Sequence, residues 1–583
     1  MAVGDTVTRL YSGFRGVDFR GEEINLTRSP DSLNMWKDYK ETDSIRTRPT
    51  LEKVNFYRRG HPEEFSNNDA IYGIHDFISS NGVHKCYIHI GKRLYRADLN
   101  DEGMYNKEPN LSILIVDGEM AERPSKSFIL DDKLYIKDGK YYCAINDDEI
   151  YSFFYIPTTS TERSPSGGGK IYQDVNMLTS KRKNTFLADG ISTEYILDAQ
   201  NLDEGGIEVR VNGEHISSGL YAVDYAKGKI TFETAPPAPL TDGQDNVEIQ
   251  FEKTVPGYKE KILECTLLQV FDNRVFFSGN PNYPNMIWHC SLSNPGYVSG
   301  TDCYEEGFDT SAVKGMVAGN NALLVIKEPS PANTSIFYHT PTTDYEFGKI
   351  YPYSHSNIST GCVGKAINFN DDIVYFSERG MEGLNGEITT EQVIAHRSSM
   401  VDRKLLAEPN YKNMILQEWE GYLLVIIDNK VYLADSRAMF TNENHMEYEW
   451  FYWDLEKKIT CSKVINGILY LGTEDGLYSL TGTTGDVESY WTTPKDKFKH
   501  PQYMKTTNKR GCVAETTGDI SLYVKTDKID FELIGDYKNI TDSFVSRIKQ
   551  KKFKDIQLKF HSKTRFSLES VTLECFIGGY IKR

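Results

Sequence analysis

The sequence has 583 residues, too many for one ordinary hydrophobic core, which predicts several domains or a large repeat architecture. Aromatic residues make up 12% of the chain, which favours a folded protein over a disordered one. The 66 basic and 83 acidic residues give a formal net charge of -17, which argues against a protein that grips nucleic acid, because such binding needs clustered Lys and Arg.

No run approaches the roughly 18 apolar residues of a membrane-spanning helix. The first residues, MAVGDTVTRLYSG, lack the apolar segment of a secretory signal. We therefore expect a chain without a membrane span that is made and folded in a cytoplasm. The nine cysteines are scattered and form no Cys-x-x-Cys pair, so buried free thiols are favoured over disulfides or zinc sites.

The N-terminal residues 14–51 predict an arm that docks onto a larger body. Its Ser-Pro-Asp and Arg-Pro pairs mark turns, because proline fixes φ and restricts the residue before it. Between these turns lies an amphipathic run with Leu33, Met35 and Trp36. Residues 44–48 then read as a short strand.

From residue 70 onward the sequence predicts short strands separated by tight turns. Residues 71–79, 84–90 and 93–98 form one group, with Asn-Gly at 81–82 as a hairpin turn. Variant copies recur at 128–144, 267–278, 366–377, 414–434 and 461–480. Their spacing of roughly 40–60 residues suits four-stranded propeller blades or stacked sheets. Helical periodicity is nearly absent, so the fold class is predicted to be all-β.

Residues 184–252 break this rhythm and read as a compact set of strands with their own turns. They resemble the small β-sandwich module common in phage tail and fibre proteins. Its F-x-x-D-G start lies at Phe186, its V-x-V-N-G centre at Val209 and its I-x-F-x-x-A-P-P end at Ile230.

The N-terminal sequence resembles the first residues of bacteriophage tail nozzle or tail-hub β-propeller proteins. The resemblance lies in SPDSLNMWKDY, followed by IRTRP, ahead of a long β-rich chain. Residues 164–178, 278–291 and 490–510 also resemble segments of that family. The resemblance implies an irregular β-propeller of roughly six to eight blades. We expect an N-terminal arm and first strand (1–55), a first part of the propeller (56–183), an inserted β-sandwich (184–252) and the remainder of the propeller (253–583).

Propeller closure requires that the first and last blades be joined. The alternating apolar residues of 567–583 predict a good last strand. Residues 45–48, or a strand soon after them, are expected to supply its N-terminal partner.

By the same resemblance, the protein is expected to be a structural virion component rather than an enzyme. Several copies, with a hexamer favoured by the resemblance, would form a ring around the DNA exit channel. Tail adaptor and fibre or tip proteins would be its partners, with viral DNA only as passing cargo. The alternative from another class is a propeller adhesin that binds host surface glycan, and the third is a propeller glycosidase.

Three motifs that contain lysine or histidine suggest a phosphate-binding or metal-binding site. Each is better explained by local backbone structure. Residues 167–170, Gly-Gly-Gly-Lys, are followed by isoleucine and no helix, unlike a phosphate-binding loop. His84 and His89 are five apart, which places their rings on opposite faces of a strand. His289 and Cys290 are adjacent and diverge in the same way, so we expect no metal.

Three further patterns also have a structural explanation. Residues 146–149 read as a solvated acidic turn without calcium-loop spacing. Glu418 and Glu420 are expected to share one strand face, as a glycosidase pair would, although exposed charges are commoner. The aromatic run 448–453 could stack against a carbohydrate, but packing inside and between propeller blades is favoured. We therefore assign no catalytic, cofactor-binding or metal-binding residues and expect no cofactor.

Overall fold

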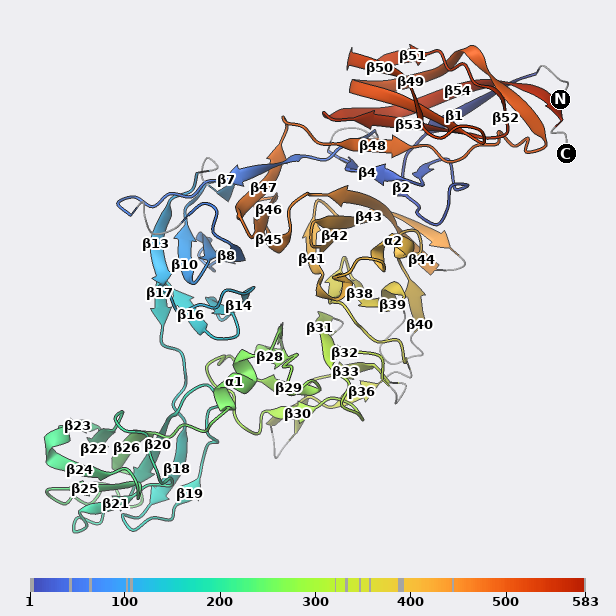
Figure 1. Ribbon diagram of the computed structural model, residues 1–583. Helices are drawn as coiled ribbons and strands as arrows, with labels where there is room; N and C mark the ends of the chain where they lie inside the picture. Colours follow the sequence, from blue (N-terminus) through green and yellow to red (C-terminus); the bar gives the residue numbers. More distant parts are fainter. Residues whose placement is uncertain are drawn as a thin grey trace. The chain divides into compact units, whose positions relative to one another are not determined.

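The computed structural model describes residues 5–40, 44–61, 66–100, 103–104, 108–319, 321–330, 334–344, 348–355, 358–385, 393–442 and 445–580. This part of the chain is nearly all β, as predicted, and is divided into many small sheets (Figure 1). It forms two compact units. Unit 1 comprises Met1–Ile78, His84–Asp117 and Thr360–Arg583, and unit 2 comprises Ser79–Val83 and Gly118–Ser359.

The described part of unit 1 contains three separate four-stranded antiparallel sheets, ordered β13-β10-β9-β8, β37-β38-β39-β40 and β45-β46-β47-β7. A fourth meander, β41 to β44, has the same hairpin order but continues into a larger sheet. The strands are β7 (Thr50–Val54), β8 (Ile71–Ile78), β9 (His84–Ile90), β10 (Arg93–Ala97), β13 (Leu111–Val116), β37 (Ala366–Phe369), β38 (Asp372–Ser377), β39 (Gly380–Asn385), β40 (Val393–His396), β41 (Ile415–Trp419), β42 (Tyr422–Ile427), β43 (Lys430–Asn442), β44 (His445–Asp454), β45 (Ile459–Ile465), β46 (Ile468–Thr473) and β47 (Gly476–Gly482).

Local sequence explains both the strands and their turns. β42 is buried at all six positions, so it reads as a continuous apolar run rather than an alternating one. Asn466 and Gly467, between β45 and β46, have φ values of 49° and 81°. A two-residue hairpin turn with positive φ at both positions favours Asn-Gly. The predicted Asn-Gly at 81–82 lies instead in a longer loop between β8 and β9, with positive φ at Gly82.

Neighbouring sheets of unit 1 pack through apolar side chains. Ile74 and Ile88 share one hydrophobic cluster with Tyr470 and Leu477, which joins the β8 sheet to the β45 sheet. Trp419 lies in a second cluster with residues of β46, and a third cluster joins the β37 sheet to β42, β43 and β44. The packing order within unit 1 is therefore β37 sheet, β41 meander, β45 sheet and β8 sheet.

The C-terminal residues build a large sheet that the sequence analysis did not anticipate. Its centre is the 24-residue strand β49 (Tyr503–Thr526), which pairs with the long last strand β54 (Phe566–Tyr580). β49 also pairs with four further strands, β50 (Glu532–Ile540), β51 (Ser543–Ser546), β52 (Lys551–Phe553) and β53 (Ile556–Ser562), and β53 in turn pairs with β48 (Ser489–Thr492).

Strands of the N-terminal segment pair with these C-terminal strands. β1 (Thr6–Ser12) and β6 (Ile45–Thr47) both pair with β54, β4 (Ser32–Leu33) pairs with β48, and β5 (Met35–Lys37) links β6 to β44. Pairing of residues 45–48 with the last strand was predicted and is present. The strand soon after them, β7, completes the β45 sheet instead. Short pairs β2 (Gly16–Val17) with β3 (Arg28–Ser29), and β11 (Leu99–Asn100) with β12 (Gly103–Met104), complete unit 1 with helix α2 (Asp402–Leu405) and the 3-10 turn η3 (Tyr411–Asn413).

Unit 2 repeats the four-stranded pattern. Its described part has sheets ordered β14-β15-β16-β17, β27-β28-β29-β30 and β31-β32-β33-β36. The strands are β14 (Lys126–Leu130), β15 (Lys133–Lys137), β16 (Tyr142–Asn146), β17 (Glu149–Tyr151), β27 (Leu267–Phe271), β28 (Arg274–Ser278), β29 (Met286–His289), β30 (Cys303–Glu305), β31 (Val313–Gly319), β32 (Ala322–Lys327), β33 (Ile336–His339) and β36 (Tyr353–His355), with the pair β34 (Thr342–Asp344) and β35 (Gly348–Ile350). One hydrophobic cluster joins the β14 sheet to the β27 sheet, and another joins the β27 sheet to the β31 sheet.

Between β17 and β27, two further sheets face each other across a separate core. Helix α1 (Tyr258–Leu263) follows them. The strands are β18 (Thr158–Arg163), β19 (Lys170–Ile171), β20 (Lys181–Phe186), β22 (Glu208–Val211), β23 (Glu214–Ile216) and β26 (Val247–Glu252) in one sheet, and β21 (Glu194–Ile196), β24 (Tyr221–Asp224) and β25 (Lys229–Phe232) in the other, with the 3-10 turn η2 (Ser218–Leu220). Phe186, Tyr195, Phe232 and Phe251 lie in their shared cluster. The six-stranded sheet begins at β18, upstream of residue 184.

Candidate functional site

The glycine run of residues 167–170 is a turn. Gly167, Gly168 and Gly169 all have positive φ, between 78° and 106°, and they connect β18 to β19. Lys170 begins β19 and its Nζ lies 2.8 Å from the Glu162 carboxylate. A strand therefore follows the glycines where a phosphate-binding loop needs a helix, in agreement with the prediction.

The histidine motifs do not converge. His84 pairs with Asp76, whereas His89 is buried at the other end of β9 and its ring contacts that of Tyr72. His289 Nδ1 lies 3.1 Å from the carbonyl oxygen of its neighbour Cys290, and burial lowers the pKa of His289. Among the described residues, no group of three or more His, Cys, Asp or Glu side chains could hold a metal ion.

The acidic motifs form turns. Residues 146–149 connect β16 to β17, and Asp147 and Asp148 have the positive φ of a two-residue hairpin turn. The expectation that Glu418 and Glu420 share a strand face is wrong. Glu420 lies in the turn between β41 and β42, with φ of 51°, and its carboxylate accepts a hydrogen bond of 2.5 Å from Lys40 Nζ.

The aromatic run 448–453 is buried. This confirms the prediction that these side chains pack in the core and do not form a carbohydrate-binding surface. Tyr448, Trp450 and Tyr452 face one hydrophobic cluster, and Phe451 and Trp453 face the other. Alternate side chains of β44 therefore fill cores on both sides of the strand. This position makes β44 the central packing element of unit 1.

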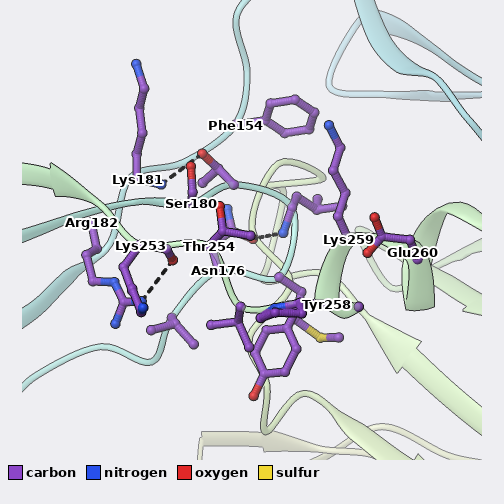
Figure 2. A pocket seen from close by; sticks show the side chains of 17 residues that line it. Phe154, Asn176, Ser180, Lys181, Arg182, Lys253, Thr254, Tyr258, Lys259 and Glu260 are labelled. Carbon is purple, nitrogen blue, oxygen red and sulfur yellow. Dashed lines mark hydrogen bonds between the residues drawn. The ribbon is translucent and has the colours of Figure 1, made fainter. Parts of the chain in front are cut away.

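The best-formed pocket among the described residues lies in unit 2, away from all these motifs. It has a volume of about 320 Å³ and is lined by Phe154, residues 175–182 and residues 253–260 (Figure 2). These two segments are the connections that lead into β20 and out of β26. The volume falls at the lower end of small-molecule sites.

The pocket has a basic character. Lys181, Arg182, Lys253 and Lys259 line it, against the single acidic residue Glu260. Figure 2 shows Lys181 and Lys259 on either side of Phe154, and Arg182 beside the backbone of Lys253. Arg182 Nη2 donates a hydrogen bond of 3.1 Å to the Lys253 carbonyl oxygen. Burial lowers the pKa of Arg182, because its charge is partly removed from water.

Sequence reasoning did not find this pocket, because its two sides are about seventy residues apart in the chain. One signal was present: a Lys-Arg-Lys run at 181–183 and the Lys-rich stretch 253–261 flank the segment with sandwich motifs. Chemically, the arrangement offers positive charges beside apolar and aromatic side chains.

Comparisons with known proteins identify no family for this chain. No family model matches it, and no curated protein matches it. BamB from Moraxella catarrhalis is a solved structure with 10% sequence identity and a TM-score of 0.32, and the match covers 78% of this chain and 94% of that one. The extracellular domain of a hybrid two-component system from B. thetaiotaomicron has 11% identity and a TM-score of 0.23, with 86% of this chain and 48% of that one covered. Likenesses at these scores carry no functional argument.

In the described part of the chain, no helix is long and apolar enough to cross a membrane.

Proposed function

We propose that this protein is a structural component of a bacteriophage tail, a nozzle or hub subunit that surrounds the DNA exit channel and docks other tail proteins. The proposal rests on the order of features along the chain. An arm that resembles the family's opening is followed by four-stranded antiparallel sheets. These are interrupted, after the second sheet, by the segment whose three motifs resemble the phage β-sandwich module.

The proposed architecture is a β-propeller in which seven four-stranded groups serve as blades. Four-stranded antiparallel sheets are the repeating unit of propellers. Support comes from the packing order inside each unit: the β14, β27 and β31 sheets follow one another in unit 2. In unit 1 the series β37, β41 and β45 ends at the β8 sheet, so the last sheet packs on the first. β7, an N-terminal strand that completes the last sheet, is a usual device for closing a propeller.

The proposed role is structural rather than enzymatic. Copies of the chain would form a ring, with a hexamer favoured by the family resemblance, between tail adaptor and fibre or tip proteins. Viral DNA would pass through without being gripped, and the net charge of -17 suits such a conduit. Burial of the aromatic run removes the feature that had favoured a glycan-binding adhesin.

Mass spectrometry of purified particles, made from the genome that encodes the chain, tests this proposal. We expect the protein in tails at a fixed copy number. Electron microscopy should then place it as a ring on the tail axis. Full-titre particles that lack the protein would contradict the proposal. So would tight, salt-sensitive binding of the isolated protein to duplex DNA, since a conduit must release DNA.

A further inference from the structure

The basic pocket in unit 2 combines features that the proposed structural role does not use. Four cationic side chains and one acidic side chain line it, in a chain whose net charge is strongly negative. We propose that this pocket binds a small organic oxyanion, a phosphate or carboxylate group carried on an apolar or ring-shaped body. This inference does not depend on the tail assignment.

Among the described residues, only Lys181 of the four cations has a carboxylate partner, and Lys253 Nζ donates a hydrogen bond of 2.6 Å to the Asn201 carbonyl oxygen. Lys259 lies with its ammonium 5.6 Å from the centre of the Phe154 ring, and no acidic group comes within ion-pair distance of it in the described part of the chain. Arg182 donates to a backbone carbonyl through Nη2 only, which leaves Nε and Nη1 without a protein acceptor among the described residues. Its half-buried charge has no carboxylate in ion-pair contact among the described residues and is favoured only from a distance by Asp198 and Asp203, a situation that a bound anion relieves.

The acidic groups around the pocket are already engaged. Glu252 accepts a hydrogen bond from Ser180 and lies 3.9 Å from Lys181, which is a weak ion pair. Asp203 accepts hydrogen bonds from the backbone N–H and the hydroxyl of Thr254. Neither carboxylate forms an ion pair with Arg182. A planar guanidinium with free N–H groups is the side chain best suited to phosphate and carboxylate oxygens.

The apolar lining of the pocket suits an organic body rather than a bare ion. Phe154, Met177, Val255 and Tyr258 line it beside the cations. Figure 2 shows the rings of Phe154 and Tyr258 on different sides of the pocket. Aromatic and aliphatic walls with a few placed charges are typical of small-molecule sites. An anion with an attached ring would bury apolar surface that inorganic phosphate cannot.

Binding would also bridge two chain segments. Arg182 lies in β20, just after the connection that enters this strand, and Lys259 lies in α1, after the connection that leaves β26. A ligand held by both would link the two connections of the β18–β26 region. Bound ligand should therefore protect residues 175–182 and 253–260 together from hydrogen exchange.

Isothermal titration calorimetry on the full chain tests the proposal with four probes: phenyl phosphate, benzoate, inorganic phosphate and benzyl alcohol. We expect saturable binding of phenyl phosphate or benzoate at least tenfold tighter than that of inorganic phosphate, and none of the uncharged alcohol. The comparison of phenyl phosphate with benzoate distinguishes the two oxyanions. Arg182→Gln should weaken binding of the preferred probe at least tenfold and Lys259→Gln about threefold.

Lys227→Gln is the matched control, because Lys227 is an exposed lysine of the same unit with its own partner, Asp224, at 3.7 Å. It should bind like the unaltered protein. Lys259 is exposed, so Lys259→Gln decides the matter even where Arg182→Gln fails to fold. Absence of saturable binding of both ring-bearing anions, or equal affinity of Lys259→Gln and Lys227→Gln, would overturn the proposal.

Discussion

Arg28 and Glu449 form a buried two-point ion pair across 421 positions of sequence. Arg28 Nε donates to Glu449 Oε2 at 2.9 Å, and Nη2 donates to Oε1 at 2.6 Å. The Glu449 side chain is fully buried and that of Arg28 is 10% exposed. The Arg28 guanidinium also lies 4.5 Å from the centre of the Phe440 ring. This ion pair connects the N-terminal segment to β44, the strand at the centre of the unit 1 core.

Arg28→Gln should destabilise unit 1 by about 3 kcal/mol, because it leaves the buried Glu449 carboxylate with only Arg15, an exposed guanidinium 3.8 Å away, as a charge partner. The free energy of unfolding, from denaturant titration, measures the loss. Lys457→Gln removes a partner from the exposed Lys457–Asp475 pair, at 2.7 Å, and should cost at most about 1 kcal/mol. Equal losses for both variants would show that the buried pair contributes no more than a surface contact.

Gly16→Ala should be strongly destabilising, since a Cβ at this position would lie 2.2 Å from the Trp450 carbonyl oxygen. The backbone φ of 153° adds strain for any other residue. We expect a loss of more than about 2 kcal/mol, as overpacking and strain combine. Gly13→Ala is the control: its φ is 61° but nothing lies within 4 Å of the added carbon, so only the smaller conformational cost of about 1 kcal/mol remains. Comparison of the two thermal midpoints checks this.

His396 should stabilise the protein in a pH-dependent way. Burial lowers the pKa of its ring, but hydrogen bonds to Asp402 and Glu382 outweigh burial and raise the pKa to about 10. In the unfolded chain a histidine has a pKa of about 6.5. The stabilisation is therefore complete below pH about 6.5 and is lost as pH rises toward about 10.

Thermal midpoints of the unaltered protein and His396→Gln, measured at pH 6 and pH 9, test that sign. The thermal midpoint of the unaltered protein should exceed that of His396→Gln by more at pH 6 than at pH 9. His561→Gln serves as a control, because the His561 ring makes one contact of 3.1 Å with the exposed Glu488 carboxylate. A difference for His396→Gln that grows with pH would contradict the assignment of a protonated ring.

Residues 157–254 should fold in isolation, because their two sheets enclose a core of their own. A fragment limited to residues 184–252 should be less stable, since it lacks β18 and the first half of β20. Circular dichroism of both fragments on heating would show a cooperative transition for the longer one at the higher temperature. A longer fragment that shows no cooperative transition would argue against an independent domain.

Strands and turns of the repeated sheets could be predicted from sequence because each depends on neighbouring residues. The hairpin around 272–273 is an example: β27 and β28 span the predicted residues, and Asp272 and Asn273 adopt the positive φ of the turn. Paired strands with two-residue turns need only local information.

The C-terminal sheet could not be predicted in the same way. β49 contains polar and apolar residues, and its pairing with β54 has register shifts. Its 24 residues therefore show no regular alternation of polar and apolar side chains. The basic pocket was missed for a related reason. Arg182 and Lys259 line one pocket only because the β18–β26 region brings the chain before β20 and the chain after β26 together, which is a tertiary property.

The interweaving of the first and last strands has a consequence for biosynthesis. β6 pairs with residues 567–568 and β1 with residues 570–576, so both find their partner β54 only at the end of synthesis, and β7 pairs only after β47 has been made. At about 5–20 residues per second, translation of the intervening chain takes roughly half a minute to two minutes. During that interval the first fifty residues emerge as unpaired strand edges that would have to be kept from other nascent chains. A polypeptide released before residue 567 would lack the partners of β6 and β1, so these two strands would stay unpaired although β7 had already paired with β47.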